Sequence, residues 1–421
     1  MFLLSLTYFI KDSNMTDSIL PKNLWLKILI GMVIGILVAL YVPISDTLKP
    51  WVSLPGDLFI ALLKMVIVPL VLSSVILGIA SAGSLNALKS MGARLIPYFI
   101  LTTAVAITIG IGITSFVEPG LAIDKSIMAP AEKITTQTLL DMSIPDRIMN
   151  TIPVNPVEAQ LSKNMLQLVI LGIIVGISLL TIKRKTTKTF RDICEFTQDL
   201  CLMVVSWAMW LAPIAVASLM VKAIGTMGMS ALSSMALYMA CVVGGLLCIL
   251  VFYMIVVWVV AKRNPLIFLS DIRNAQMIAF STSSSMATMP VSLSVAEERL
   301  KTSDDVHGFV IPLGATINMD GTALYQATVA IFLCQIFGID LSLGETILLL
   351  ITTIGASIGT PGLPGVGLIV LATILSSIGV PAEGIGLILG VDRLLDMCRT
   401  TINVTGDLTA TVVMERWMHG K

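Results

Sequence analysis

Residues 391–413 read VDRLLDMCRTTINVTGDLTATVV and carry a set of polar side chains inside an otherwise apolar segment. The members of the set are Asp396, Arg399, Thr400, Asn403 and Asp407. At about 100° per residue, these positions fall within roughly one third of a helix circumference. The segment therefore predicts a helix with one polar face, whose other faces are apolar.

The whole chain is too apolar for a soluble domain. Of its 421 residues, 56% are hydrophobic and 12% are charged, against about 25% charged in an ordinary soluble domain. A charged side chain near the centre of a bilayer costs about 2.5–3.5 kcal/mol, so the polar face must look into protein or an aqueous cavity. An ion pair that only holds a helix bundle together is the alternative, and the additional oxygen atoms of Thr400, Asn403 and Asp407 disfavour it.

Charge and cysteine content exclude several function classes. The 26 basic and 26 acidic residues give a formal net charge of zero, so the chain has no basic field that would bind nucleic acid. The six cysteines form no CxxC pair, and the two histidines are not clustered with acids, which disfavours zinc. We expect no organic cofactor and no nucleic-acid partner.

Apolar runs of about 20 residues, the length that spans a bilayer as a helix, fill the first part of the chain. They lie near 25–43, 57–82, 95–116, 165–182, 200–222 and 232–261. Lys and Arg concentrate in alternate connections such as 183–191, which predicts that these connections and the N-terminus are cytoplasmic. The proline-broken connection at 117–163 is expected on the opposite side, at least in part outside the membrane.

From residue 268 onward, turn-forming residues interrupt the apolar runs. STSSSMATMP at 281–290 and GASIGTPGLPGVG at 355–367 lie in the middle of such runs, where a turn needs protein or water around its backbone. Such turns are typical of re-entrant hairpins, and ordinary extramembrane loops are the alternative. Because a polar segment follows each one, we expect a hairpin and a broken helix twice, at 268–338 and 343–418. Paired discontinuous segments indicate a transporter's substrate site.

A second polar group lies in GATINMDGTAL at 314–324. Asn318, Asp320 and Thr322 are two residues apart, a spacing that does not stack on one helix face. We expect a locally unwound helix whose carbonyl and side-chain oxygens face a cation, because hard cations prefer oxygen ligands. A glycine kink with a buried polar patch is the alternative.

Three motifs together resemble those of the glutamate transporter family, the dicarboxylate/amino acid:cation symporters. They are TSSSMATMP at 282–290, NMDGT at 318–322 and DMCRTTINVTGD at 396–407. The resemblance covers the chain from residue 24 onward, and the motifs are most similar to those of prokaryotic sodium-coupled aspartate/glutamate symporters. It implies an all-α polytopic membrane protein with eight transmembrane helices, two re-entrant helical hairpins, inverted repeats and an elevator-type mechanism. It also implies a homotrimer.

The resemblance further implies a division of the chain into a scaffold and a transport domain. The expected parts are a cytoplasmic leader at 1–23, scaffold helices 1 and 2 at 24–92, transport-domain helix 3 at 93–117, an extracellular segment with scaffold helices 4 and 5 at 118–225, and the rest of the transport domain at 226–421. We expect a multi-pass protein of the cell inner (plasma) membrane with both termini in the cytoplasm.

Each matching residue also receives a role by resemblance. Arg399 would clamp the substrate's side-chain carboxylate, and Asp396 would hold its ammonium group. The other substrate-binding residues would be Ser284, Ser285, Thr322, Gly365, Thr400 and Asn403. Sodium ions would be held by three sets of residues: Gly314, Asn318, Asn403 and Asp407; Thr316, Ser357, Ile358 and Thr360; and Thr102, Thr103, Asn318 and Asp320.

Three positions depart from the family's pattern. Met286 stands at a hairpin tip where relatives often carry serine or an acidic residue, so Ser285 or the backbone must contact the substrate's α-carboxylate. Phe99 stands where sodium-coupled relatives have tyrosine, which puts that ligand of the third sodium set in doubt. Pro361 is unusual in the second hairpin.

The nature of the cargo follows from the two charged residues assigned to it. A guanidinium binds a carboxylate through two parallel hydrogen bonds, so Arg399 favours an acidic side chain. Asp396 favours an amino group, and therefore L-aspartate or L-glutamate over succinate or malate. We expect a symporter rather than an enzyme. A proton-coupled glutamate or C4-dicarboxylate symporter of the same family is the alternative.

Charge in the empty site predicts coupling to cations. If Arg393 balances Asp392, the three carboxylates of Asp320, Asp396 and Asp407 face the single guanidinium of Arg399, which leaves a charge of about minus two when all are ionised. An acidic amino acid adds another negative charge, so several cations must enter with it. Sodium ions are the expected co-substrates, and protons replace some of them if the carboxylates are protonated.

Two other classes of protein are disfavoured. A passive channel needs a continuous polar pore, whereas the acids and bases cluster on two segments and leave the other spans apolar. An intramembrane hydrolase would take a serine from residues 281–285 as nucleophile, but neither His307 nor His419 lies within a span to act as its base.

Overall fold

The computed structural model describes residues 24–42, 45, 47–80, 88–122, 152–161, 165–182, 184–227, 230–358, 362, 367, 370–371, 374–375, 380 and 384–420. Most of these residues are helical, and none lies in a strand. The predicted all-α fold class is therefore confirmed for the described part of the chain. The expected leader at 1–23 and most of the connection at 117–163 lie outside it.

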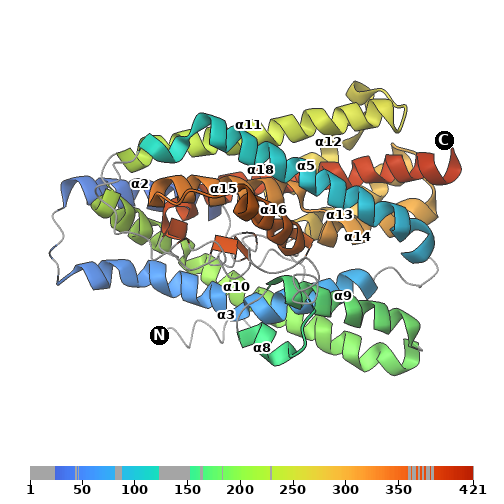
Figure 1. Ribbon diagram of the computed structural model, residues 1–421, viewed down its shortest axis with the longest axis horizontal. Coiled ribbons are helices and arrows are strands. Elements are labelled where there is room, and N and C mark those ends of the chain that lie inside the picture. The colour runs from blue at the N-terminus through green and yellow to red at the C-terminus, as the bar shows by residue number, and fades with distance from the viewer. Residues whose placement is uncertain are drawn as a thin grey trace.

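The helices form two groups that lie side by side along the long axis of the molecule (Figure 1). In the first group α10 packs on α2 and α3, α3 packs on α9, and α9 contacts the short helix α8. These helices are α2 (Leu24–Tyr41), α3 (Lys49–Ala80), α8 (Pro156–Leu161), α9 (Met165–Thr181) and α10 (Arg184–Met227).

The second group surrounds the C-terminal helix α18, drawn in red in Figure 1. Helices α11, α12, α14 and α15 all pack on α18, and α5 packs on α11 and α15. The group consists of α5 (Ala93–Val117), α11 (Ser230–Val259), α12 (Pro265–Thr282), α13 (Ser285–Glu298), α14 (Asp304–Ile317), α15 (Asp320–Phe337), α16 (Leu343–Ile358) and α18 (Gly384–His419). The short helical turns η1 (Leu88–Gly92) and η2 (Pro119–Ala122) flank α5.

Each of the six apolar runs predicted to span the membrane overlaps a helix, namely α2, α3, α5, α9, α10 and α11. Among the described residues, three helical stretches are both long and apolar enough to cross a bilayer: Ala93–Leu121, Thr186–Lys222 and Ser234–Val259. The total of eight transmembrane helices stays a prediction.

Helix α10 is longer than the span predicted within it, at 44 residues. Residues 184–191, which we expected in a connection, form its first turns instead. Arg191 gives a physical reason, because its guanidinium donates to the carbonyl of Ala80 at 3.2 Å and to that of Leu179 at 3.3 Å. These carbonyls lie in the last turns of α3 and α9, where a helix leaves them without a backbone partner.

The first predicted hairpin is present between α12 and α13, which pack on each other. Helix α12 starts after Asn264, whose side chain accepts a hydrogen bond from the Leu266 amide, and it ends at Ser283, which has a φ of 53°. Ser284 follows directly and caps α13 by accepting from the Ala287 amide at 3.1 Å. A left-handed residue next to a capping serine reverses the chain within two residues.

The two predicted helix breaks have different outcomes. The first is confirmed, because Asn318 and Met319 are non-helical between α14 and α15. The second is wrong, because α18 runs unbroken from Gly384 to His419. Its polar residues do not interrupt the helix, since two of them have partners at the start of α15 and at the break before it: Asn403 bonds Thr322 and Asp407 bonds Asn318. Most of the second hairpin beyond α16 lies outside the described residues.

Glycines allow the helices of the first group to approach each other closely. A Cβ atom on Gly35 of α2 would lie 2.5 Å from the backbone oxygen of Ala217 in α10. A Cβ on Gly176 of α9 would lie 2.7 Å from the Cβ of Ile79 in α3. Small residues at such crossings are typical of helices packed within a membrane.

We expect Gly35→Ala to lower the stability of the purified protein by about 1–3 kcal/mol, because the added methyl group overlaps a backbone atom. Thermal unfolding in detergent measures the effect. The matched control is Gly112→Ala on α5, where an added Cβ has no atom within 4 Å. Equal unfolding temperatures for the two variants would contradict the tight α2–α10 packing.

Candidate functional site

The tips of the two hairpins meet through the backbone of Gly362. Its carbonyl accepts hydrogen bonds from the Ser284 hydroxyl at 2.9 Å and from the Met286 amide at 3.2 Å. A Cβ on Gly362 would lie 2.5 Å from the Ala315 oxygen and 2.8 Å from the Cβ of Ser285. Gly362, in the segment expected to form the second hairpin, is therefore seated closely against the tip of the first.

The two serines predicted to contact the substrate differ in their bonding. Ser284 is already used, since it caps α13 and bonds Gly362. The Ser285 hydroxyl is buried and has no hydrogen-bond partner among the described residues. A buried hydroxyl without a hydrogen-bond partner destabilises the fold. Ser285 is therefore the residue at this tip whose hydroxyl is available to bind a ligand.

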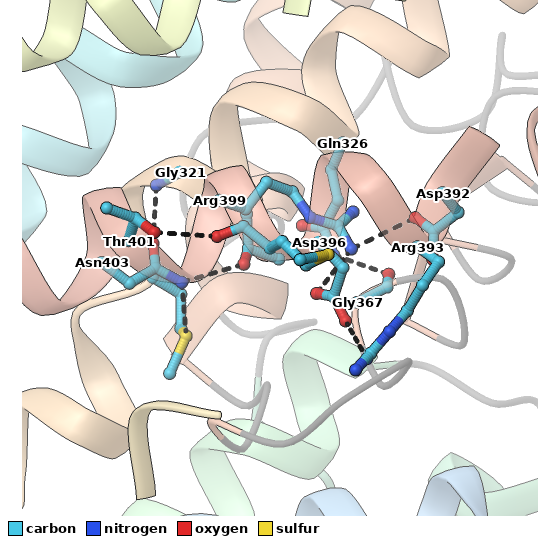
Figure 2. A network of polar contacts seen from close by, with 12 residues as sticks. Gly321, Gln326, Gly367, Asp392, Arg393, Asp396, Arg399, Thr401 and Asn403 are labelled. Carbon is cyan, nitrogen blue, oxygen red and sulfur yellow. Dashed lines mark hydrogen bonds and ion pairs between the residues drawn. The ribbon is translucent and has the colours of Figure 1, made fainter. Parts of the chain in front are cut away.

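Arg399 lies fully buried at the centre of the site, as Figure 2 shows. Its Nη2 atom is 2.8 Å from Oδ1 of Asp396 and 3.1 Å from Oδ1 of Asp392. The guanidinium carbon lies 3.8 Å from the centre of the Tyr325 ring, which adds a cation–π contact. Its Nε and Nη1 atoms have no hydrogen-bond partner among the described residues. Arg399 can therefore donate further hydrogen bonds to an anion.

The ion pairs near Arg399 differ from the pairing assumed in the charge estimate. Arg393 does not pair with its neighbour in sequence, Asp392, but lies 3.6 Å from Oδ2 of Asp396. Residues i and i+3 lie on the same helix face, whereas i and i+1 do not, which explains the correction. Asp396 thus lies between two guanidinium groups, and Asp392 pairs with Arg399.

Gly367 of the second hairpin covers this cluster. Its carbonyl accepts a hydrogen bond from Nε2 of Gln326 at 3.2 Å. A Cβ at this position would lie 3.2 Å from Thr322 and 3.6 Å from the guanidinium of Arg399. Gln326 had no signal in the sequence, because it lies outside the NMDGT motif and its partner is 41 residues away.

Asn403 and Thr322 connect α18 to the start of α15. Oδ1 of Asn403 accepts from the Gly321 amide at 2.8 Å, and Nδ2 donates to the Thr322 hydroxyl at 3.2 Å. Thr400 is buried one helical turn from Asp396. The predicted substrate residues of α15 and α18 therefore lie together, while Gly365 lies outside the described residues.

The first predicted sodium set is brought together around Asp407. Nδ2 of Asn318 donates to Oδ1 of Asp407 at 2.9 Å and also lies 3.4 Å from the carbonyl of Asn403. A Cβ on Gly314 would overlap the Asp407 carboxylate. The Oδ1 atom of Asn318 is buried and has no hydrogen-bond partner among the described residues. This group offers several oxygens at the break between α14 and α15.

The third predicted set is centred on Asp320. The Thr103 hydroxyl donates to one carboxylate oxygen at 2.6 Å, and the Tyr253 hydroxyl donates to the other at 2.7 Å. The Thr102 hydroxyl instead bonds the carbonyl of Phe99 at 3.1 Å. Tyr253 was missed by sequence analysis, because it is one aromatic residue in an apolar span.

The second predicted set is not brought together within the described residues. The Thr316 hydroxyl bonds the carbonyl of Leu313 on its own helix, and the Ser357 hydroxyl bonds that of Ile354 on its own helix. Ile358 is the last residue of α16, and its side chain is not among those that the structure describes. Thr360 lies outside the described residues.

The oxygen-rich groups differ from a transition-metal centre. No group of three or more His, Cys, Asp or Glu side chains that would hold a metal ion occurs in the described part of the chain. Around Asp320 and Asp407 the ligand atoms available are carboxylate, hydroxyl, amide and carbonyl oxygens, which hard cations prefer. The chemistry of these residues fits small hard cations that travel with a substrate.

Apolar helices that enclose a buried, charged site, closed by contact between two hairpins, are the features of a membrane transporter for a charged solute. A family model described as "Sodium:dicarboxylate symporter family" matches residues 24–417. The chain therefore belongs to the sodium:dicarboxylate symporter family. This family consists of transporters, so the hydrolase and the passive channel are set aside.

Curated relatives extend over nearly the whole chain. It is 33% identical to the "Proton/glutamate-aspartate symporter" of Escherichia coli (strain K12), over 93% of this chain and 92% of that protein. It is 32% identical to "Excitatory amino acid transporter 3" of Bos taurus, over 94% and 86%. It is 31% identical to the "Proton/sodium-glutamate symport protein" of Bacillus caldotenax, over 93% of each.

We expect Gly314→Ala to abolish transport activity, because the new methyl group would displace the Asp407 carboxylate. Uptake into proteoliposomes is the measurement. Gly308→Ala is the control on the same helix, where an added Cβ has no atom within 4 Å. Full activity of Gly314→Ala, with the protein reconstituted in equal amount, would show that the position of Asp407 is not important for transport.

Proposed function

We propose that this protein is a secondary active symporter that imports acidic amino acids, L-aspartate or L-glutamate, together with sodium ions by an elevator alternating-access mechanism. The observation that carries the proposal is the buried Arg399 guanidinium, two of whose nitrogen atoms have no hydrogen-bond partner in the described part of the chain, beside an acid-rich cluster. A substrate that brings both a carboxylate and an ammonium group would match this arrangement.

Substrate binding would replace the ion pair between Arg399 and Asp396 by two ion pairs between these residues and the substrate. Arg399 and Asp396 form an ion pair at 2.8 Å. The substrate's side-chain carboxylate would bind the free edge of Arg399, and its ammonium would bind Asp396. Because each charge keeps an opposite partner, the exchange avoids leaving a buried ion unpaired. The printed names of the Escherichia coli and Bacillus relatives, which include glutamate, support an acidic substrate.

Coupling to cations would follow from the excess of acids. Asp392 and Asp396 pair with the two guanidinium groups of Arg393 and Arg399, whereas Asp320 and Asp407 are buried and have only uncharged hydrogen-bond partners among the described residues. Adding an acidic amino acid increases the negative charge, so binding is favoured when cations neutralise Asp320 and Asp407. Sodium would bind at the two oxygen-rich groups, and the closing of the second hairpin would follow.

The two helix groups support a division into a scaffold and a transport domain. We propose that α2, α3, α9 and α10 form the scaffold and that α5, α11–α16 and α18 carry the substrate. Where the groups meet, the side chain of Thr316 lies against Gly78, at a position where a Cβ would be 2.7 Å from its hydroxyl. We further propose a homotrimer in the cell inner membrane, with both termini cytoplasmic.

A proton-coupled symporter is the second candidate, and the name of the Escherichia coli relative favours it. In that case protons rather than sodium ions would neutralise the carboxylates. A C4-dicarboxylate symporter is disfavoured, because Asp396 would then repel the second carboxylate of the substrate.

We expect Arg399→Cys to reduce uptake of L-aspartate by at least about 100-fold, because it removes the carboxylate's partner in a buried site. Uptake of a neutral amino acid such as L-serine should persist or rise. Arg299→Cys, an exposed position at the end of α13, is the matched control and should retain aspartate uptake. Unchanged aspartate transport by Arg399→Cys would refute the assignment of Arg399.

We expect an inward sodium gradient alone to drive L-aspartate accumulation in proteoliposomes, and an inward proton gradient alone to drive none. Unlabelled aspartate or glutamate should compete, whereas succinate and serine should not. Accumulation driven by the proton gradient alone would favour the second candidate, and equal competition by succinate would favour a C4-dicarboxylate.

A further inference from the structure

Tyr253 is a polar group that the proposed mechanism has not used. It lies fully buried on α11, within residues 249–257, which are otherwise apolar. Its hydroxyl donates to Oδ2 of Asp320 at 2.7 Å, while Thr103 of α5 donates to Oδ1 at 2.6 Å. Each oxygen of this carboxylate is therefore bonded by a hydroxyl from a different helix.

Gly406 of α18 leaves the space that this phenol occupies. A Cβ at Gly406 would lie 2.5 Å from the Tyr253 hydroxyl oxygen and 2.6 Å from Nδ2 of Asn318. The phenol and the amide thus lie next to the same point of the α18 backbone. Since Asn318 bonds Asp407, the Tyr253 hydroxyl lies between the two oxygen-rich groups.

We propose that Tyr253 is a positioning residue for the cation that Asp320 binds, and that it sets the affinity for sodium. The inference rests on the proposed sodium coupling. Two donated hydrogen bonds fix the plane of the carboxylate, so its remaining lone pairs point in a defined direction. A hydroxyl that donates its proton keeps lone pairs of its own, which lie beside a cation at Asp320.

The position of Tyr253 also gives α11 a part in cation binding. Helix α11 carries no acidic or basic side chain between Ser230 and Val259. The phenol is the group through which this helix contacts the Asp320 carboxylate. Loss of the hydroxyl would free the carboxylate to rotate, whereas the aromatic ring would continue to fill its place in the core.

The test is Tyr253→Phe, which removes one oxygen atom and keeps the ring. Sodium binding to the detergent-purified protein is followed by tryptophan fluorescence, and by the rise in unfolding temperature that sodium produces. We expect the sodium concentration for half-saturation to increase about tenfold or more, since hydrogen bonds to charged groups are the stronger class. The Michaelis constant for L-aspartate at saturating sodium should not change.

Two further variants separate positioning from packing. Tyr238→Phe removes another buried phenol of α11, whose hydroxyl has no hydrogen-bond partner among the described residues, and it should leave sodium binding unchanged. In an Asp320→Asn background, Tyr253→Phe should have no further effect, because the charge it orients is gone.

The outcomes distinguish this inference from the proposed function. A wild-type protein that shows no response to sodium would overturn the sodium coupling and the role of Tyr253 with it. A sodium-responsive wild type with unchanged affinity in Tyr253→Phe would overturn the role of Tyr253 alone. Equal weakening by Tyr238→Phe would likewise reduce Tyr253 to a packing residue.

Discussion

The architecture depends on keeping one guanidinium away from lipid and water at the same time. Arg399 is fully buried and is stabilised by Asp396, Asp392 and the face of Tyr325. A buried charge requires partners with good geometry, because the free-energy cost of its desolvation exceeds the electrostatic attraction of a single poorly aligned ion pair. The helices around α18 supply these partners and exclude lipid, and the second hairpin covers them through Gly367.

The predicted features that the structure confirms are those with a strong local pattern. The polar face of α18 follows from helical spacing alone, and the break at Asn318 follows from a spacing that no continuous helix accommodates. The break expected in α18 is wrong for a related reason. Polar residues disrupt a membrane helix only when they lack partners, and whether partners exist depends on helices distant in sequence.

Other features of the site had no sequence signal. Tyr253 and Gln326 lie outside the three motifs, and their partners Asp320 and Gly367 are 67 and 41 residues away in the sequence. The pairing of Arg393 with Asp396 instead of Asp392 depends on rotamers as well as on helical spacing. The length of α10 depends on Arg191, which bonds the ends of two other helices. For Tyr253, Gln326 and Arg191, contacts between residues distant in sequence determine the structure, and the local sequence does not show them.

The contact between the hairpin tips uses a main-chain acceptor, the carbonyl of Gly362, and one of its two donors is the main-chain amide of Met286. Every residue type possesses the carbonyl, and every type except proline possesses the amide N–H. A substitution of the Met286 side chain by any residue except proline therefore leaves this hydrogen bond available. Sequences can diverge at this position while the contact between α13 and Gly362 is inherited unchanged.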